Sequence, residues 1–367
     1  MRARISLCLG VFSVMALSNA IVPILAGFGD GTFSQGAIYS AYFFGAFLLV
    51  LPSGFFADRI GEIPLVRAGL LLTLLSGLLI AAVPSTPLLI FFRLLEGIGA
   101  GLFVPSALSL INARPDHEAG SGTFMAMLNI GLVAGLIGGG WLVEVSGALM
   151  SGILLFTASA AIPAVASVFL APGPGRALPP ETVSETLQRL VRVAGDYFWL
   201  WFSAVIMLGT TGALTVLYPE FSSLSPGVLG MTVAAMSIST AITVVIVSRI
   251  HLPPIPALRV AAVGMAGAVM LVFLTPLSFI LVGALAGVVM IAQLAFLATS
   301  EARQGVVMGL FNAASYGGMS IMPFIAGFIA EFSSFFLAFL VVACLGLVVA
   351  VTVGRGRAAE RGWQPGG

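Results

Sequence analysis

The sequence contains no lysine, only two cysteines and two histidines, and few charged residues of any kind. Charged residues make up 8% of the 367 positions, whereas ordinary soluble domains carry about 25%. Cys8 and Cys344 lie far apart within apolar segments, which favours small buried residues over a disulfide. His117 and His251 lie in separate loops, so neither a metal site nor another cofactor is predicted. These shortages exclude an ordinary soluble domain and a disulfide-stabilised fold.

Hydrophobic residues, at 59% of the chain, form long runs. A helix needs about 20 such residues to cross a bilayer, and an open sheet in lipid would leave backbone groups unpaired. We therefore predict an all-α polytopic membrane protein with twelve transmembrane helices. The predicted spans are 4–27, 35–57, 64–83, 87–111, 121–144, 147–170, 196–218, 227–247, 257–275, 277–298, 305–330 and 333–353.

The positive charges lie on one side of this predicted topology. All 15 basic residues are arginines, and 14 of them flank the apolar runs on a single alternating side. Basic loops stay in the cytoplasm during insertion, so we predict a multi-pass protein of the cell membrane with both termini cytoplasmic. No basic face exists that could bind nucleic acid, which leaves the lipid bilayer as the predicted large partner. The opposite loops carry only acids near helix ends, namely Asp30, Glu144, Glu220 and Glu331.

The chain consists of two similar halves. The pattern Glu-Ala-x-x-Gly-x-x-Met-x-x-x-Asn occurs at 118–129 and again at 301–312, an offset of 183 positions that also places Gly135 on Gly318. Repeats of this kind are common in transporters, which place the substrate site between them. Further matched pairs are Pro23 with Pro219, and Ser34-x-Gly36 with Ser225-x-Gly227. The predicted divisions are a six-helix bundle at 1–170, a cytoplasmic linker with a short amphipathic helix at 171–195, a second six-helix bundle at 196–353 and a cytoplasmic tail at 354–367.

Residues 1–20 also resemble a secretory signal, with two arginines, an apolar core and the small residues Ser18-Asn19-Ala20. The apolar run continues past that point through Ile24 and Leu25. Cleavage would also remove the first helix and destroy the symmetry of the halves. We therefore predict an uncleaved first helix.

One arginine breaks the charge pattern. Arg93 lies inside the fourth run, and Glu96 follows three residues later on the same helical face. An unpaired charge inside the membrane is expensive, so we expect the two to form an ion pair, or Arg93 to bind backbone carbonyls. Glu96 is the only acid deep within any run. Three roles stay open: a structural ion pair, a proton carrier at Glu96, and an anion-binding site at Arg93.

Two further segments carry glycines at informative positions. Segment 54–61, after the second run, reads Gly-Phe-Phe-Ala-Asp-Arg-Ile-Gly. Here Gly54 is expected to let helices approach, and Gly61 to permit a tight turn. In the fifth run, glycines four residues apart share one helix face and allow close packing on a neighbouring helix. The predicted packing glycines are Gly131, Gly135, Gly139 and Gly140.

Together with the repeat, these motifs resemble those of the major facilitator superfamily. Segment 54–61 is similar to the family's G-x-x-x-D-R-x-G-R/K loop between helices 2 and 3, and segment 93–97 to its R-x-x-x-G motif in helix 4. The fifth-run glycines are similar to a pattern associated with exporters and antiporters, although Leu136 stands where that pattern has proline. The resemblance implies two pseudo-symmetric six-helix halves, alternating access and function as a monomer.

The resemblance also implies a cytoplasmic gate at segment 54–61, in which Asp58 caps a neighbouring helix and pairs with an arginine. Glu62 and Ile63 stand where the family usually has basic residues, and Arg67, about one turn further on, is a candidate replacement. The predicted gating residues are Gly54, Asp58, Arg59 and Gly61.

By analogy with the family, helices 1, 4, 7 and 10 line the substrate cavity, with Asn19, Thr211 and Gln293 as candidate polar contacts. Because polar residues are sparse there, the cavity suits an amphipathic substrate. We expect a transporter rather than an enzyme, one that exports a small amphipathic molecule with H⁺ coupling through Glu96, modulated by Arg93. The alternatives are uptake of a small anionic metabolite through Arg93, and a membrane sensor or assembly partner that does not transport.

Overall fold

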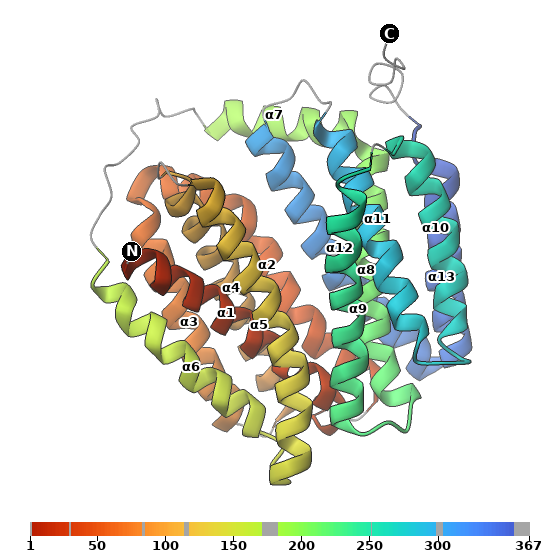
Figure 1. The fold of residues 1–367 in the computed structure, drawn as a ribbon, viewed down its shortest axis with the longest axis horizontal. Helices are drawn as coiled ribbons and strands as arrows, with labels where there is room; N and C mark the ends of the chain where they lie inside the picture. The colour runs from red at the N-terminus through yellow and green to blue at the C-terminus, as the bar shows by residue number, and fades with distance from the viewer. Residues whose placement is uncertain are drawn as a thin grey trace. The chain divides into compact units, whose positions relative to one another are not determined.

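A computed structural model describes residues 2–28, 31–82, 85–113, 117–170, 183–250, 252–298 and 304–355. Over these ranges the chain is helical and contains no strand (Figure 1). The elements are α1 (Arg2–Ala20), the 3-10 helix η1 (Val22–Gly27), α2 (Thr32–Ile60), α3 (Glu62–Ala82), α4 (Thr86–Asn112), α5 (His117–Ser146), α6 (Ser151–Val168), α7 (Val183–Asp196), α8 (Phe198–Phe221), α9 (Pro226–Val247), α10 (Pro254–Leu271), α11 (Ser278–Ala298), α12 (Gln304–Phe332) and α13 (Phe335–Thr352).

Twelve helical segments of the described chain are long and apolar enough to cross a membrane, which confirms the predicted number. The first of these spans, Arg4–Gly27, consists of most of α1 together with η1. The remaining helix, α7, lies almost entirely within segment 171–195, where a short amphipathic helix was predicted, and residues 171–182 of that segment lie outside the described residues. Cys344 was expected to be buried but is exposed, because lipid rather than protein covers the outer faces of membrane helices.

The chain forms two compact units. Unit 1 comprises Met1–Pro179 and Tyr218–Ala234, and unit 2 comprises Pro180–Leu217 and Ala235–Gly367. Unit 1 therefore contains the first six membrane spans together with the adjoining ends of α8 and α9.

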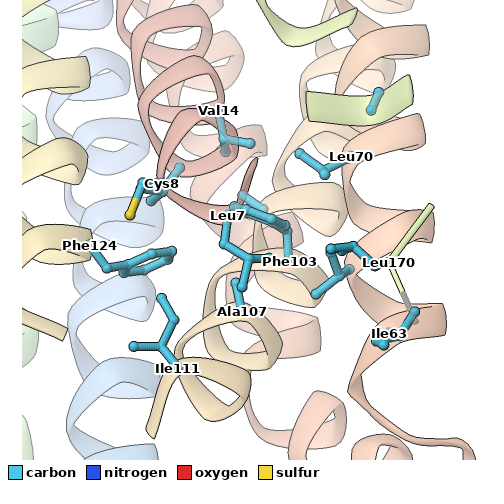
Figure 2. Packing of buried hydrophobic residues seen from close by; sticks show 14 of the residues in the cluster. Leu7, Cys8, Val14, Ile63, Leu70, Phe103, Ala107, Ile111, Phe124 and Leu170 are labelled. Atoms are coloured by element: carbon cyan, nitrogen blue, oxygen red, sulfur yellow. The ribbon is translucent and has the colours of Figure 1, made fainter. Parts of the chain in front are cut away.

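The core of unit 1 is built from apolar side chains of α1, α3, α4 and α5 (Figure 2). Leu7, Leu70, Phe103 and Phe124 are each no more than 1% exposed. Gly10 makes room for one of these rings, because a Cβ at Gly10 would lie 2.6 Å from Cζ of Phe103. In a membrane, such close packing takes the place of a hydrophobic driving force between helices.

A glycine stripe brings α5 against α1. A Cβ at any of three glycines in α5 would overlap a backbone carbonyl oxygen of α1. Only glycine permits such contact between helix backbones. The contacts pair Gly131 with Phe12, Gly135 with Ala16, and Gly139 with Ala20.

Unit 2 repeats this arrangement at the matched position. Gly318 of α12, which corresponds to Gly135 in the sequence repeat, lies against the carbonyl oxygen of Val205 in α8. A Cβ there would overlap this oxygen, as a Cβ at Gly135 would overlap that of Ala16. The internal repeat of the sequence is therefore also a repeat of helix packing.

Candidate functional site

The candidate site is a buried ion pair on α4. Nη1 of Arg93 donates to Oε2 of Glu96 at 2.6 Å, and the two side chains are 1% and 0% exposed. The predicted pairing is therefore present. Nη2 of Arg93 also donates to the carbonyl oxygen of Ser18 in α1 at 3.2 Å. The guanidinium carbon lies 4.8 Å from the ring centroid of Tyr42 in α2, which adds a cation–π contact.

The sequence of α1 explains why a carbonyl is available to Arg93. Pro23 has no N–H to donate to the carbonyl of Asn19, four residues earlier, so the α-helix ends at Ala20 and a 3-10 helix follows. The last carbonyls of a helix lack intrahelical partners and carry a partial negative charge. Arg93 therefore lies where a broken membrane helix presents backbone oxygen.

Glycine four residues after Arg93 brings Tyr42 to the site. A Cβ at Gly97 would overlap the carbonyl oxygen of Tyr42, and a Cβ at Gly45 would overlap that of Leu94. The backbones of α2 and α4 therefore touch beside the ion pair. This contact gives the R-x-x-x-G spacing a physical reason, since the glycine lets the Tyr42 ring reach the guanidinium group.

Two polar atoms of the ion pair remain without partners. Nε of Arg93 and Oε1 of Glu96 are both buried. Within the described part of the chain, the first finds no acceptor and the second no donor. Buried polar atoms are rarely left unpaired, and exceptions call for a functional or solvent partner. The site thus offers one free donor and one free acceptor, which suits binding of a proton, a water molecule or a polar ligand group.

The three candidate cavity residues differ in their contacts. Nδ2 of Asn19 donates to the Met15 carbonyl at 2.9 Å, and Oγ1 of Thr211 donates to the Leu208 carbonyl at 2.7 Å, so each bonds its own helix. Gln293 is fully buried. Its Nε2 donates to Oγ of Ser203 in α8 at 3.0 Å, which joins α11 to α8 within unit 2.

The segment predicted to form a gate is only partly as expected. Gly61 has φ +82° and ends α2, which fits its role in a tight turn. A Cβ at Gly54 would meet no described atom within 4 Å, so the expected close approach is wrong for this structure. Asp58 is exposed at the helix end, and among the described residues its side chain has no ion-pair partner. Arg59 lies 4.3 Å from the ring centroid of Phe55.

Arg67 has a different role from the one considered for it. Its guanidinium group donates to three carbonyl oxygens at the end of α6, at 2.9 to 3.0 Å. It therefore caps the last turn of α6 instead of replacing the missing basic residues of the loop. The acceptors are Ser167, Val168 and Leu170.

Sequence reasoning missed a set of polar contacts at the opposite, arginine-free end of unit 1. Oε1 of Glu144, in α5, accepts the N–H of Gly227 at the start of α9 at 2.9 Å. Nε2 of Gln35, in α2, donates to Oε2 of Glu220 in α8 at 2.7 Å. These partners are 83 and 185 positions apart, so no local sequence signal could have paired them.

These features define a polytopic membrane protein with a charged site in its interior. A sequence profile of the Major Facilitator Superfamily matches residues 5–323, and the chain belongs to that family. Family membership places the chain among membrane transporters.

Curated relatives carry efflux names. The chain is 41% identical over 115 residues to the multi-drug resistance efflux pump PmrA of Streptococcus pneumoniae, a match that covers 29% of this chain and 28% of that protein. It is 30% identical over 138 residues to the multidrug resistance protein B homolog of Mycobacterium tuberculosis, with 36% and 25% covered. The matched part therefore spans less than a third of these relatives.

Solved structures show the same fold along the whole chain. A mutant of the nucleoside transporter NupG superposes with a TM-score of 0.75 at 16% identity, over 95% of this chain and 98% of that one. The human organic anion transporter MFSD10 superposes with a TM-score of 0.70 at 17% identity, over 96% and 98%. At such identities the likeness concerns the fold alone.

Proposed function

We propose that this protein exports a small amphipathic molecule across the cell membrane in exchange for protons, with Glu96 as the proton carrier. The observation that carries the proposal is the free, fully buried Oε1 of Glu96 beside its partnered Oε2. A carboxyl group that is buried and adjacent to a cation changes its proton affinity when either the burial or the distance changes. Alternating access changes both.

Arg93 supports this role because its other contacts do not depend on Glu96. When Glu96 is protonated, the guanidinium group keeps the Ser18 carbonyl and the face of Tyr42. A cation left alone in the membrane would be costly, and these two contacts reduce that cost. Glu96 can therefore lose its charge without leaving Arg93 unpartnered, which favours a proton carrier over a purely structural ion pair.

The direction of transport is proposed from the relatives and the orientation from the arginines. The named relatives are efflux pumps, and their matches cover part of their length. Apart from Arg93 and the two arginines of α7, the described arginines lie at or near one end of the membrane helices, as at Arg4, Arg59 and Arg249. We infer that this end and both termini face the cytoplasm.

The test is dye accumulation in cells that lack their own efflux pumps, with wild type and Glu96→Gln compared at equal membrane expression. Wild type should lower accumulation of lipophilic dyes, and both the substitution and an uncoupler should remove the effect. Glu118→Gln is the matched control, because Glu118 is an exposed acid near the start of α5. Full dye export by Glu96→Gln would show that the proton moves elsewhere.

A second candidate function is uptake of a small organic anion, which the free Nε of Arg93 favours. In this case the guanidinium group would bind the anion, and Glu96 would only hold it in place. Arg93→Gln should then abolish anion binding by the purified protein, whereas Glu96→Gln should leave it largely intact. Under the proton-exchange proposal, Glu96→Gln should instead abolish dye export, whereas Arg93→Gln should affect it less.

Segment 54–61 remains a proposed gate at the arginine-bearing end. Its Asp58 is exposed and lies at the end of α2, where a carboxylate can pair with a partner during the cycle. Asp58→Asn should slow export while leaving the folded protein as stable as wild type. Unchanged export rates would assign Asp58 to membrane topology alone.

A further inference from the structure

Unit 2 contains a pocket that none of the roles above uses. About 360 Å³ of empty space lies between the first turns of α8 and α10, the last turns of α11 and the residues that follow α13. Part of this space is open to the surroundings, so a ligand bound here would remain partly outside the protein, as a lipid does. All four segments lie at the arginine-bearing ends of membrane helices, the level at which lipid headgroups meet acyl chains.

One rim of this pocket carries Arg355, which the backbone holds in place. The chain after α13 turns at Gly354, with φ +86°. The preceding carbonyl, that of Val353, accepts both Nε and Nη2 of Arg259 at 3.3 and 3.0 Å. A Cβ at Gly354 would also lie 2.8 Å from Cγ2 of Ile255. Contact with α10 therefore places Arg355, and its own side chain remains available.

The pocket lining also includes Asp196, the last residue of α7. The junction between α7 and α8 is fixed by hydrogen bonds, because the N–H of Tyr197 and Nε1 of Trp201 both donate to the Val193 carbonyl, at 3.2 and 3.3 Å. In the part of the chain that the structure describes, no side-chain hydrogen bond or ion pair is made by Asp196 or Arg355. The pocket lining thus contains one acidic and one basic residue.

The walls between these charges are aromatic and aliphatic. Tyr197 and Phe296 meet edge to face, with ring centroids 6.2 Å apart and planes at 78°. Trp199 and Ile255 also belong to the apolar part of the lining. Tyrosine and tryptophan favour the membrane–water interface, so this lining suits a ligand that has a polar end and an apolar chain.

We propose that this pocket binds a zwitterionic aminophospholipid of the bilayer, with its ammonium group at Asp196, its phosphate at Arg355 and its upper acyl chain against Ile255 and Phe296. A primary ammonium group donates hydrogen bonds to a carboxylate, which the quaternary ammonium of phosphatidylcholine cannot do. The anionic phosphatidylglycerol offers no cation to Asp196. The proposal does not depend on transport, so it stands or fails apart from the proposed function.

The experiment measures retained lipid. The full chain is reconstituted in vesicles of equal parts phosphatidylethanolamine, phosphatidylcholine and phosphatidylglycerol and then solubilised. Native mass spectrometry identifies the lipids that remain bound from the mass of each complex. Wild type should enrich phosphatidylethanolamine. Asp196→Asn should lower its ratio to phosphatidylcholine about three- to tenfold, as expected for loss of one charge-assisted hydrogen bond at a partly exposed site. Arg355→Gln should lower both of these lipids, since both carry the phosphate.

Two further variants keep the test decisive. Arg249→Gln removes an exposed arginine that follows α9 and does not line the pocket, so retention should equal wild type. Ile255→Trp fills the pocket without removing a charge and should lower total retained lipid. Equal phosphatidylethanolamine retention in all variants would overturn the proposal. Enrichment of phosphatidylglycerol, or displacement of every lipid by an exported dye, would assign the pocket to anions or to substrate instead.

Discussion

Gly135 of α5 offers a direct test of the contact that fixes α1. In Gly135→Ala the new Cβ would overlap the Ala16 carbonyl oxygen, and the next atoms, at 2.9 Å, also belong to the Ala16 backbone. No side-chain rotation can relieve an overlap with backbone, so α1 and α5 must move apart. Overpacking of this kind costs about 1–3 kcal/mol. Because alanine is about 0.5–1 kcal/mol more favourable than glycine in a helix, its higher helix propensity offsets part of this cost.

Gly122→Ala is the matched control in the same helix. A Cβ at Gly122 would meet no described atom within 4 Å, and the residue is exposed. Its variant gains the same helix stability without an overlap. Because the propensity contribution cancels, the two variants should differ by the overlap alone, about 1–3 kcal/mol, with Gly122→Ala the more stable.

Chemical unfolding of the purified variants in detergent, followed by circular dichroism, measures this difference. Dye export should also fall in Gly135→Ala, since a displaced α1 moves the Ser18 carbonyl away from Arg93. Two variants of equal stability would show that the helices separate at no cost. The reasoning that the glycine stripe fixes α1 would then be refuted.

Three other substitutions probe single contacts. Tyr42→Leu removes the ring face above Arg93 and should lower the free energy of unfolding by about 0.5–2 kcal/mol. Tyr42→Phe keeps the ring face and should lower it by less. Equal losses of stability in thermal unfolding would contradict a cation–π contribution. Arg67→Gln removes the donors to the end of α6 and should lower the free energy of unfolding by about 1.5–3 kcal/mol. Amide hydrogen exchange in the last turn of α6 should become faster. Unchanged exchange there would contradict the capping role. Gly61→Ala forces a side chain into φ +82° and should cost about 1–2 kcal/mol by thermal unfolding; wild-type stability would mean that the turn changes its conformation.

The membrane architecture could be predicted from the sequence because its physical causes are local. Run length and the requirement for paired backbone groups give the twelve spans. The Arg93–Glu96 pair follows from a three-residue spacing on one helix. In each case the interacting groups are close in sequence, so periodicity alone is informative.

Partners from other helices could not be predicted in this way. The sequence placed the glycines of α5 on one face but could not name α1 as the helix they touch. Likewise, Ser18 and Tyr42 complete the Arg93 site from two other helices. The proline at position 23 was a usable signal, since it marks where α1 must break, but it does not say which cation uses the freed carbonyls.

The prediction for Gly54 was wrong for a related reason. Its place in a family-like motif predicted close helix packing, yet the position is open in this structure. A motif preserves the spacing of residues but not the distance to a neighbouring helix. Arg67 shows the same limit, because its side chain reaches α6 instead of the loop.

The backbone contacts between α1 and α5 also have a consequence for how this transporter can evolve. The glycines of α5 touch carbonyl oxygens of α1, and every amino acid provides a carbonyl oxygen. Side chains on the other faces of α1, Asn19 among them, can therefore be exchanged without disturbing the joint between the two helices. Sequence changes on these faces can therefore accumulate one substitution at a time while the scaffold stays the same.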